Sequence, residues 1–84
     1  MQYTYRPHGV CSRAIDIELD EEGVIRSVRF LGGCHGNLQG IAALVKGRPA
    51  EEVIEDLRGI CCGMKTTSCP DQLAQALEEA LEEL

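Results

Sequence analysis

The fold is decided by the stretch SRAIDIELD-EEG-VIRSVRFL, residues 12 to 31. In its first part, three apolar side chains alternate with acidic ones, namely Ile15, Ile17 and Leu19. This period of two is typical of a strand with one buried face and predicts a strand over residues 12–20. The acidic turn that follows ends in Gly23, as hairpin turns often do, so we expect the chain to return as a second strand over residues 24–31.

The second strand of this hairpin is predicted to bury one face, formed by Val24, Val28 and Phe30. Arg26 interrupts that face, so we expect the strand to lie near an edge of the sheet. Residues 2–6 are rich in strand-forming side chains and predict a short additional strand.

Three helices are predicted in the rest of the chain, over residues 37–46, 49–58 and 69–83. Gly47 closes the first, and Pro49 suits the first turn of the second. Ser68 is the expected N-cap of the third, with Asp71 as its capping partner. Residues 1–84 are therefore predicted to form a single α+β domain, in which a small antiparallel sheet of about three strands packs against three helices.

Composition and charge exclude several classes of function. The 84 residues carry a net charge of −6, and the eight basic residues form no patch in the sequence, which argues against a nucleic-acid partner. No apolar run is long enough for a membrane span or an export signal, so we expect a cytoplasmic protein. In that reducing compartment cysteines serve as ligands or redox thiols more often than as structural disulfides. So short a chain also gains stability from a metal or a partner.

The five cysteines all lie beside turn-forming residues, and none lies within an apolar stripe. Four thiolates that converge would suit tetrahedral Zn²⁺, with an iron–sulfur cluster as the alternative. No C-x₂-C pair occurs, so the spacing is not that of a zinc ribbon. Of the adjacent pair, Cys62 precedes a glycine and is the preferred ligand, whereas Cys61 is expected to end a packed segment. The predicted ligands are Cys11, Cys34, Cys62 and Cys69.

Other interpretations remain open. His35 and Cys61 are alternate ligands, although a solvent-exposed loop histidine is the simpler interpretation of His35. Cys62 and Cys69 would be the pair in a thiol–disulfide redox relay. The cysteines could also be small buried hydrophobes of a structural domain. The leucine line from Leu73 to Leu84 is most simply core, with a homodimer seam as the alternative, so the partner is either another protein or a second copy.

The chain also resembles a known family. Thr67-Ser68-Cys69-Pro70-Asp71 spells the signature of the TSCPD domain family, and Gly32-Gly33-Cys34 and Cys62-Gly63 are similar to its other motifs. The resemblance covers essentially the whole chain and implies the stand-alone form, whose four signature cysteines fall on the four predicted ligands and leave Cys61 outside.

Related domains occur at the C-terminus of adenosylcobalamin-dependent ribonucleotide reductases, so this resemblance implies a link to ribonucleotide reductase and DNA biosynthesis. The chain is too short for a nucleotide-binding barrel or a cobalamin site. A family label of ribonucleoside-diphosphate reductase would then describe ancestry, and we expect an accessory module that is not an enzyme on its own.

The first half is also similar, more weakly, to the U-type iron–sulfur scaffold proteins. Cys11 and Cys34 fall where two scaffold cysteines stand. Arg13 occupies the position of a scaffold aspartate, and Cys62 follows Cys61 where the scaffold cysteine follows a histidine. The resemblance implies a shared fold, whereas these departures leave cluster assembly in doubt.

Overall fold

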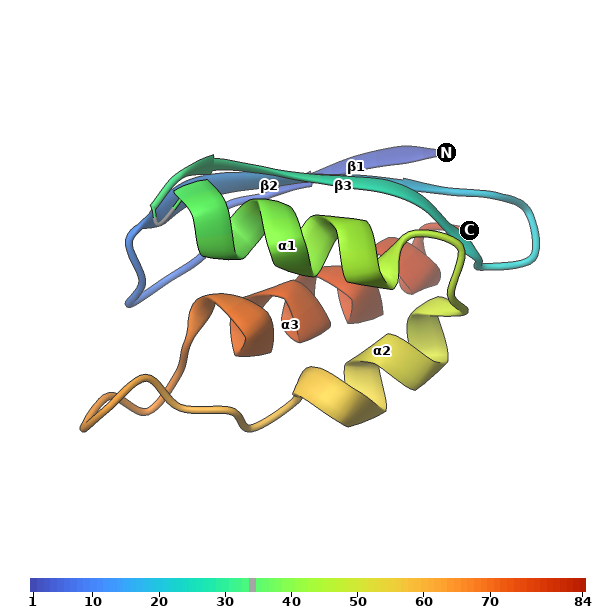
Figure 1. Cartoon of the computed structure of the whole chain (residues 1–84). Helices are drawn as coiled ribbons and strands as arrows, with labels where there is room; N and C mark the ends of the chain where they lie inside the picture. Colours follow the sequence, from blue (N-terminus) through green and yellow to red (C-terminus); the bar gives the residue numbers. More distant parts are fainter. Residues whose placement is uncertain (34) are drawn as a thin grey trace.

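Three strands precede three helices along the chain (Figure 1). The computed structural model describes residues 1–33 and 35–84. The elements are β1 (Gln2–Tyr5), β2 (Ser12–Leu19), β3 (Ile25–Gly32), α1 (His35–Val45), α2 (Ala50–Leu57) and α3 (Cys69–Glu82). Each predicted element is present, with its ends shifted by no more than a few residues, so the predicted α+β class is confirmed.

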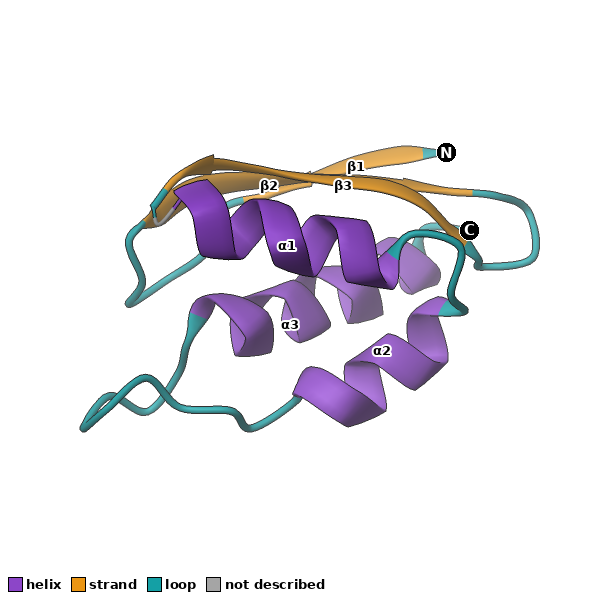
Figure 2. Cartoon of the chain, viewed as in Figure 1, coloured by secondary structure: helices purple, strands orange, loops and turns teal. Residues whose placement is uncertain are grey.

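The strands form one antiparallel sheet in the order β1-β2-β3, which makes β3 an edge strand as expected. All three helices lie on the same side of this sheet (Figure 2). Helix α1 packs against β3, α3 packs beneath β1 and β2, and α2 packs against α3. The opposite face of the sheet carries none of the described helices and presents polar side chains such as Thr4 and Asp16, which share a hydrogen bond of 2.9 Å.

The core lies between the sheet and α3. The alternating residues of β2 are buried as predicted, and Leu73 and Leu77 of α3 are fully buried beneath them. The leucine line of α3 is therefore core over most of its length, whereas Leu84 at its end is about half exposed (51%). Among the described residues, no helix combines the length and the apolar character needed to cross a membrane.

The predicted buried face of β3 is wrong at its first position. Ile25 is fully buried, whereas Val24 is only partly buried and forms an isolated bridge with Pro49. The cause is a bulge, because the register moves from Glu18–Ser27 to Leu19–Ile25 and leaves Arg26 as the extra residue. A bulge reverses the alternation at that point, so Arg26 faces solvent without interrupting the core face.

Local signals fix the ends of the hairpin and of α3. In the hairpin turn, the Asp20 carboxylate accepts backbone N–H bonds from Glu22 and Val24, both of 2.9 Å. Gly23 has a φ of 83°, a conformation that glycine adopts without strain. At α3, the Ser68 hydroxyl accepts a hydrogen bond from the Asp71 N–H, which confirms the predicted N-cap.

Candidate metal centre

Three segments meet at one end of the molecule, namely the β1–β2 loop and the start of α3, which carry Cys11 and Cys69, and the C-terminal end of β3 (Figure 1). Cys11 closes the β1–β2 loop and is exposed. Its Sγ lies 3.2 Å from the position that a Cβ would occupy at Gly33. Gly33 precedes Cys34, the predicted ligand that falls outside the described residues. The absence of a side chain at Gly33 therefore lets the Cys11 sulfur approach the end of β3 closely.

Cys69 is the first residue of α3 and is partly buried. Its Sγ lies 3.4 Å from the hydroxyl oxygen of Ser12, a hydrogen-bonding distance for sulfur. Ser12 is buried and directly follows Cys11. This contact therefore ties the start of α3 to the start of β2. The position of Cys69 at a helix N-terminus also favours a negatively charged ligand, because the first turn presents unpaired N–H groups.

Cys61 and Cys62 lie in the exposed loop that joins α2 to α3. The Cys62 N–H donates to the carbonyl of Thr67 (3.1 Å), and the Cys62 carbonyl accepts from the N–H of Lys65 (3.1 Å). The prediction that Cys61 ends a packed segment is wrong, because Ile60 and Cys61 are both exposed. The Cys61 thiol contacts only the nearby Gly59 carbonyl, at 3.5 Å, among the contacts that the structure gives it.

The loop is held to α3 by Asp71. Its carboxylate accepts hydrogen bonds from the Gly59 N–H (2.7 Å), the Thr67 hydroxyl (2.5 Å) and the Gln75 side-chain amide (3.0 Å). The Thr67 hydrogen bond is the main cause that lowers the pKa of Asp71, and the Gly59 N–H adds to it. A second tie comes from the Ser68 hydroxyl, which donates to the Ile60 carbonyl (2.6 Å).

Gln72 joins the other cysteine-bearing loop to the same place. This residue is buried, and its side-chain carbonyl accepts a hydrogen bond from the His8 N–H (2.9 Å). Its amide nitrogen donates to the Thr67 hydroxyl (3.0 Å). One side chain therefore links the β1–β2 loop, which carries Cys11, to the α2–α3 loop, which carries Cys62. The glutamine gave no signal in the sequence, because its partners lie far from it along the chain.

A hollow of about 610 Å³ separates these two loops. One wall is formed by residues 9–11, which include Cys11, and the other by residues 64–67. Lys65 is a basic residue that lines it, and the cysteine-bearing segments 6–13, 31–36 and 59–72 contain Arg6, Arg13 and Lys65 but only one carboxylate. In a chain with a net charge of −6, these segments are therefore locally basic in sequence.

The structure thus brings the segments that carry Cys11 and Cys69 together at one end, and the described residues form no finished site there. Among the side chains of the described part of the chain, no group of three or more histidine, cysteine or acidic residues is arranged to hold a metal ion. Cys11 and Cys69 are linked through Ser12, whereas Cys62 lies on the exposed α2–α3 loop. The side chain of the alternate ligand His35 also lies outside the description.

A model of the TSCPD domain matches residues 2–81. The chain belongs to the TSCPD domain family. In this TSCPD domain the signature residues 67–71 form the junction between the α2–α3 loop and α3 that the contacts of Thr67, Ser68 and Asp71 hold together. Comparison with curated proteins and with solved structures gives no match.

Proposed function

We propose that this TSCPD domain is a small metal-binding accessory module in which Cys11, Cys34, Cys62 and Cys69 bind one Zn²⁺ ion, or alternatively an iron–sulfur cluster. The observation that carries the proposal is the sulfur–hydroxyl contact of 3.4 Å between Cys69 and Ser12. It joins two cysteine-bearing segments from opposite ends of the sequence. The approach of the Cys11 sulfur to Gly33 brings in the segment that precedes Cys34.

The donor set suits such a metal. Thiolates are the ligands that structural zinc sites and iron–sulfur clusters share. Four thiolates around Zn²⁺ leave a net charge of −2, and the surrounding arginine and lysine side chains would offset this charge. The bound metal would add its binding free energy to the stability of a domain with a small core.

Cys62 is the ligand that must move. It lies on the exposed α2–α3 loop, and among the described residues it forms no group with Cys11 and Cys69 that could hold a metal ion. Its backbone is held by Thr67, but Gly63 follows it with a φ of 60° and gives the chain freedom to turn. We therefore expect metal binding to close this loop and to protect its amide hydrogens from exchange with solvent.

The role of the loaded module is proposed from the resemblance to domains of ribonucleotide reductases. We assign it to the cytoplasm, as a protein-binding accessory to deoxynucleotide synthesis without catalysis of its own. A homodimer is the alternative assembly. Size-exclusion chromatography with light scattering would separate the two, because only the homodimer gives twice the chain mass without another protein.

The decisive experiment measures metal content after purification without oxygen. Elemental analysis of the wild-type protein should give close to one zinc per chain, whereas iron with absorption near about 400 nm would indicate a cluster. Cys62→Ser and Cys69→Ser should lose the metal. Cys61→Ser is the matched control, since it changes the adjacent thiol of the same exposed loop and should keep the metal.

Other outcomes would point elsewhere. Wild-type protein without metal, in which Cys62 and Cys69 form a disulfide on oxidation by peroxide and reopen with a dithiol, would replace the metal site with a redox relay. If Cys61→Ser loses as much metal as Cys62→Ser, the assignment of the ligand within the pair is wrong. If the melting temperature is unchanged by a chelator and by all the substitutions, the cysteines have only a packing role.

A further inference from the structure

The open edge of β3 is a feature that a metal site does not explain. At its beginning, Ile25 exchanges backbone hydrogen bonds with Gly47 and Arg48, which close that end of the edge. From Ser27 to Gly32, β3 pairs only with β2 within the described part of the chain. An edge strand of this kind presents backbone N–H and C=O groups to which another extended chain can bind.

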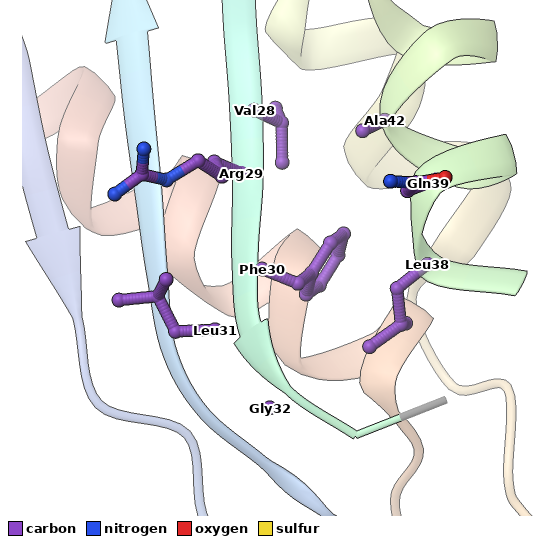
Figure 3. A pocket seen from close by; sticks show the side chains of 8 residues that line it. All are labelled: Val28, Arg29, Phe30, Leu31, Gly32, Leu38, Gln39 and Ala42. Carbon is purple, nitrogen blue, oxygen red and sulfur yellow. The ribbon is translucent and has the colours of Figure 1, made fainter. Parts of the chain in front are cut away.

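An apolar groove runs beside this edge. It has a volume of about 480 Å³ and lies between β3 and α1. Val28 and Phe30 of β3 point toward α1, and Leu38 and Ala42 face them from the helix (Figure 3). Leu31, which also lines this groove, is about 39% exposed. A strand added to β3 would place alternate side chains over this groove.

The charge of this part of the chain is opposite to that of the rest. Residues 24–50, which contain β3 and α1, include four of the eight basic residues and none of the fourteen acidic ones. Arg26 and Arg29 are exposed on β3, and Lys46 is exposed just after α1. Two of these basic residues are already paired, Arg29 with Asp16 and Arg48 with carboxylates of α2. Among the described residues Arg26 and Lys46 have no ion pair, so these two side chains leave positive charge at the edge beside the apolar groove.

We propose that the open edge of β3 binds an extended segment of another protein in which apolar residues alternate with acidic ones. The other side of β3 already has such a neighbour. In β2, Ile17 lies opposite Val28 on the core face, and Asp16 lies opposite Arg29 on the outer face, where the two charges are 3.8 Å apart. A strand offers the same side chains to both of its neighbours, so a second strand with the β2 pattern fits the open side.

A second copy of this chain does not supply such a segment. Its β2 is paired on both sides and is not available. Its two edge strands are β1, which has no charged residue, and β3, which is itself basic. Pairing β3 with β3 would place arginines from both copies along one short ladder, which is unfavourable. The occupant is therefore a different protein with an acidic strand.

The test uses the whole protein and two synthetic peptides. The first is a fluorescein-labelled peptide of about eight residues in which Val or Ile alternates with Asp or Glu, and the second carries Lys in place of every acidic residue. Anisotropy titrations should show saturable binding of the acidic peptide and weaker binding of the basic one. Hydrogen exchange should show new protection on Ser27–Gly32 when the acidic peptide is bound.

The variant Arg26→Gln/Arg29→Gln should weaken binding of the acidic peptide by roughly three- to ten-fold. The matched control is Arg6→Gln, which removes the same kind of charge from the loop after β1, the strand at the other edge of the sheet. Circular dichroism checks that all variants are folded. The proposal is overturned if neither peptide binds, if both bind equally, or if the protected amides lie outside β3.

Discussion

Asp71 holds the α2–α3 loop against α3, so its replacement by asparagine is expected to destabilise the protein strongly. Its carboxylate is buried, with an exposed fraction of 7%, and it accepts three hydrogen bonds of 2.5 to 3.0 Å. Hydrogen bonds to a charged group contribute about 1.5–3 kcal/mol each to stability. Asparagine has the same shape but only one acceptor oxygen.

In Asp71→Asn, the remaining oxygen can keep the bond from the Gly59 N–H. The new amide then faces the Gln75 side-chain amide, so two donors meet and neither has an acceptor there. The Thr67 hydroxyl also loses its charged acceptor. With one bond retained but weakened and two lost or reversed, we expect a loss of about 2–4 kcal/mol in the free energy of unfolding near neutral pH.

The pH dependence of this loss follows from the pKa of Asp71. The Thr67 hydrogen bond first, and the Gly59 N–H next, lower this pKa in the folded protein below its unfolded value of about 3.9. The unfolded state therefore binds the proton more readily. The stabilisation is fully present above the unfolded pKa and is lost as the pH falls through the folded pKa. The difference between wild type and Asp71→Asn should thus stay constant down to about pH 5 and narrow below about pH 4.

Urea unfolding followed by far-ultraviolet circular dichroism, repeated between about pH 3 and pH 7, measures this difference directly. The control is Asp56→Asn, which removes an exposed carboxylate that pairs with Arg48 and should cost far less. The reasoning is refuted if Asp71→Asn costs no more than Asp56→Asn at neutral pH. It is also refuted if the loss is as large at about pH 3 as at pH 7.

Three further substitutions test the framework of the site by the same urea unfolding. Ser68→Ala removes both the N-cap of α3 and the bond to the Ile60 carbonyl, and should cost about 1–2 kcal/mol; a cost near zero would show that α3 does not need this cap. Leu77→Ala should cost about 2–5 kcal/mol because the side chain is fully buried, and an unchanged midpoint would contradict the assignment of Leu77 to the core. Gly33→Ala should cost about 1–3 kcal/mol, because φ is 82° and the new Cβ would lie 2.8 Å from Leu38; full stability would show that this close approach is absent.

Features that depend on neighbours in the sequence could be predicted from it. The alternation in β2 identifies a strand with one buried face, because a period of two leaves no other way to bury Ile15, Ile17 and Leu19 together. Ser68 and Asp71 identify the start of α3, because the cap is made by residues only three positions apart.

Features that depend on contacts between residues far apart in the sequence could not be predicted from it. Arg26 becomes a bulge while Ile25 bonds to Gly47 and Arg48, residues that follow α1, and no pattern within β3 reports that contact. The same limit applies to the candidate site. Cys61 is predicted to end a packed segment because it follows the apolar residue Ile60. Ile60 is exposed in the fold, so this prediction from a neighbour in the sequence fails. Gln72 is decisive for joining two loops and yet looks like an ordinary polar residue of a helix.

The five residues of the family signature have different structural roles. Thr67 and Asp71 fasten the α2–α3 loop, Ser68 caps α3 and holds Ile60, and Pro70 occupies the first turn of the helix, where its missing N–H costs no hydrogen bond. Only Cys69 is left with a side chain suited to bind a metal. Because the four other residues fix the start of α3 and one end of the loop, the position of the Cys69 sulfur beside Ser12 is set by the backbone. Cys62 lies on the exposed α2–α3 loop, so in the proposed site a bound metal would have to complete the geometry of that loop.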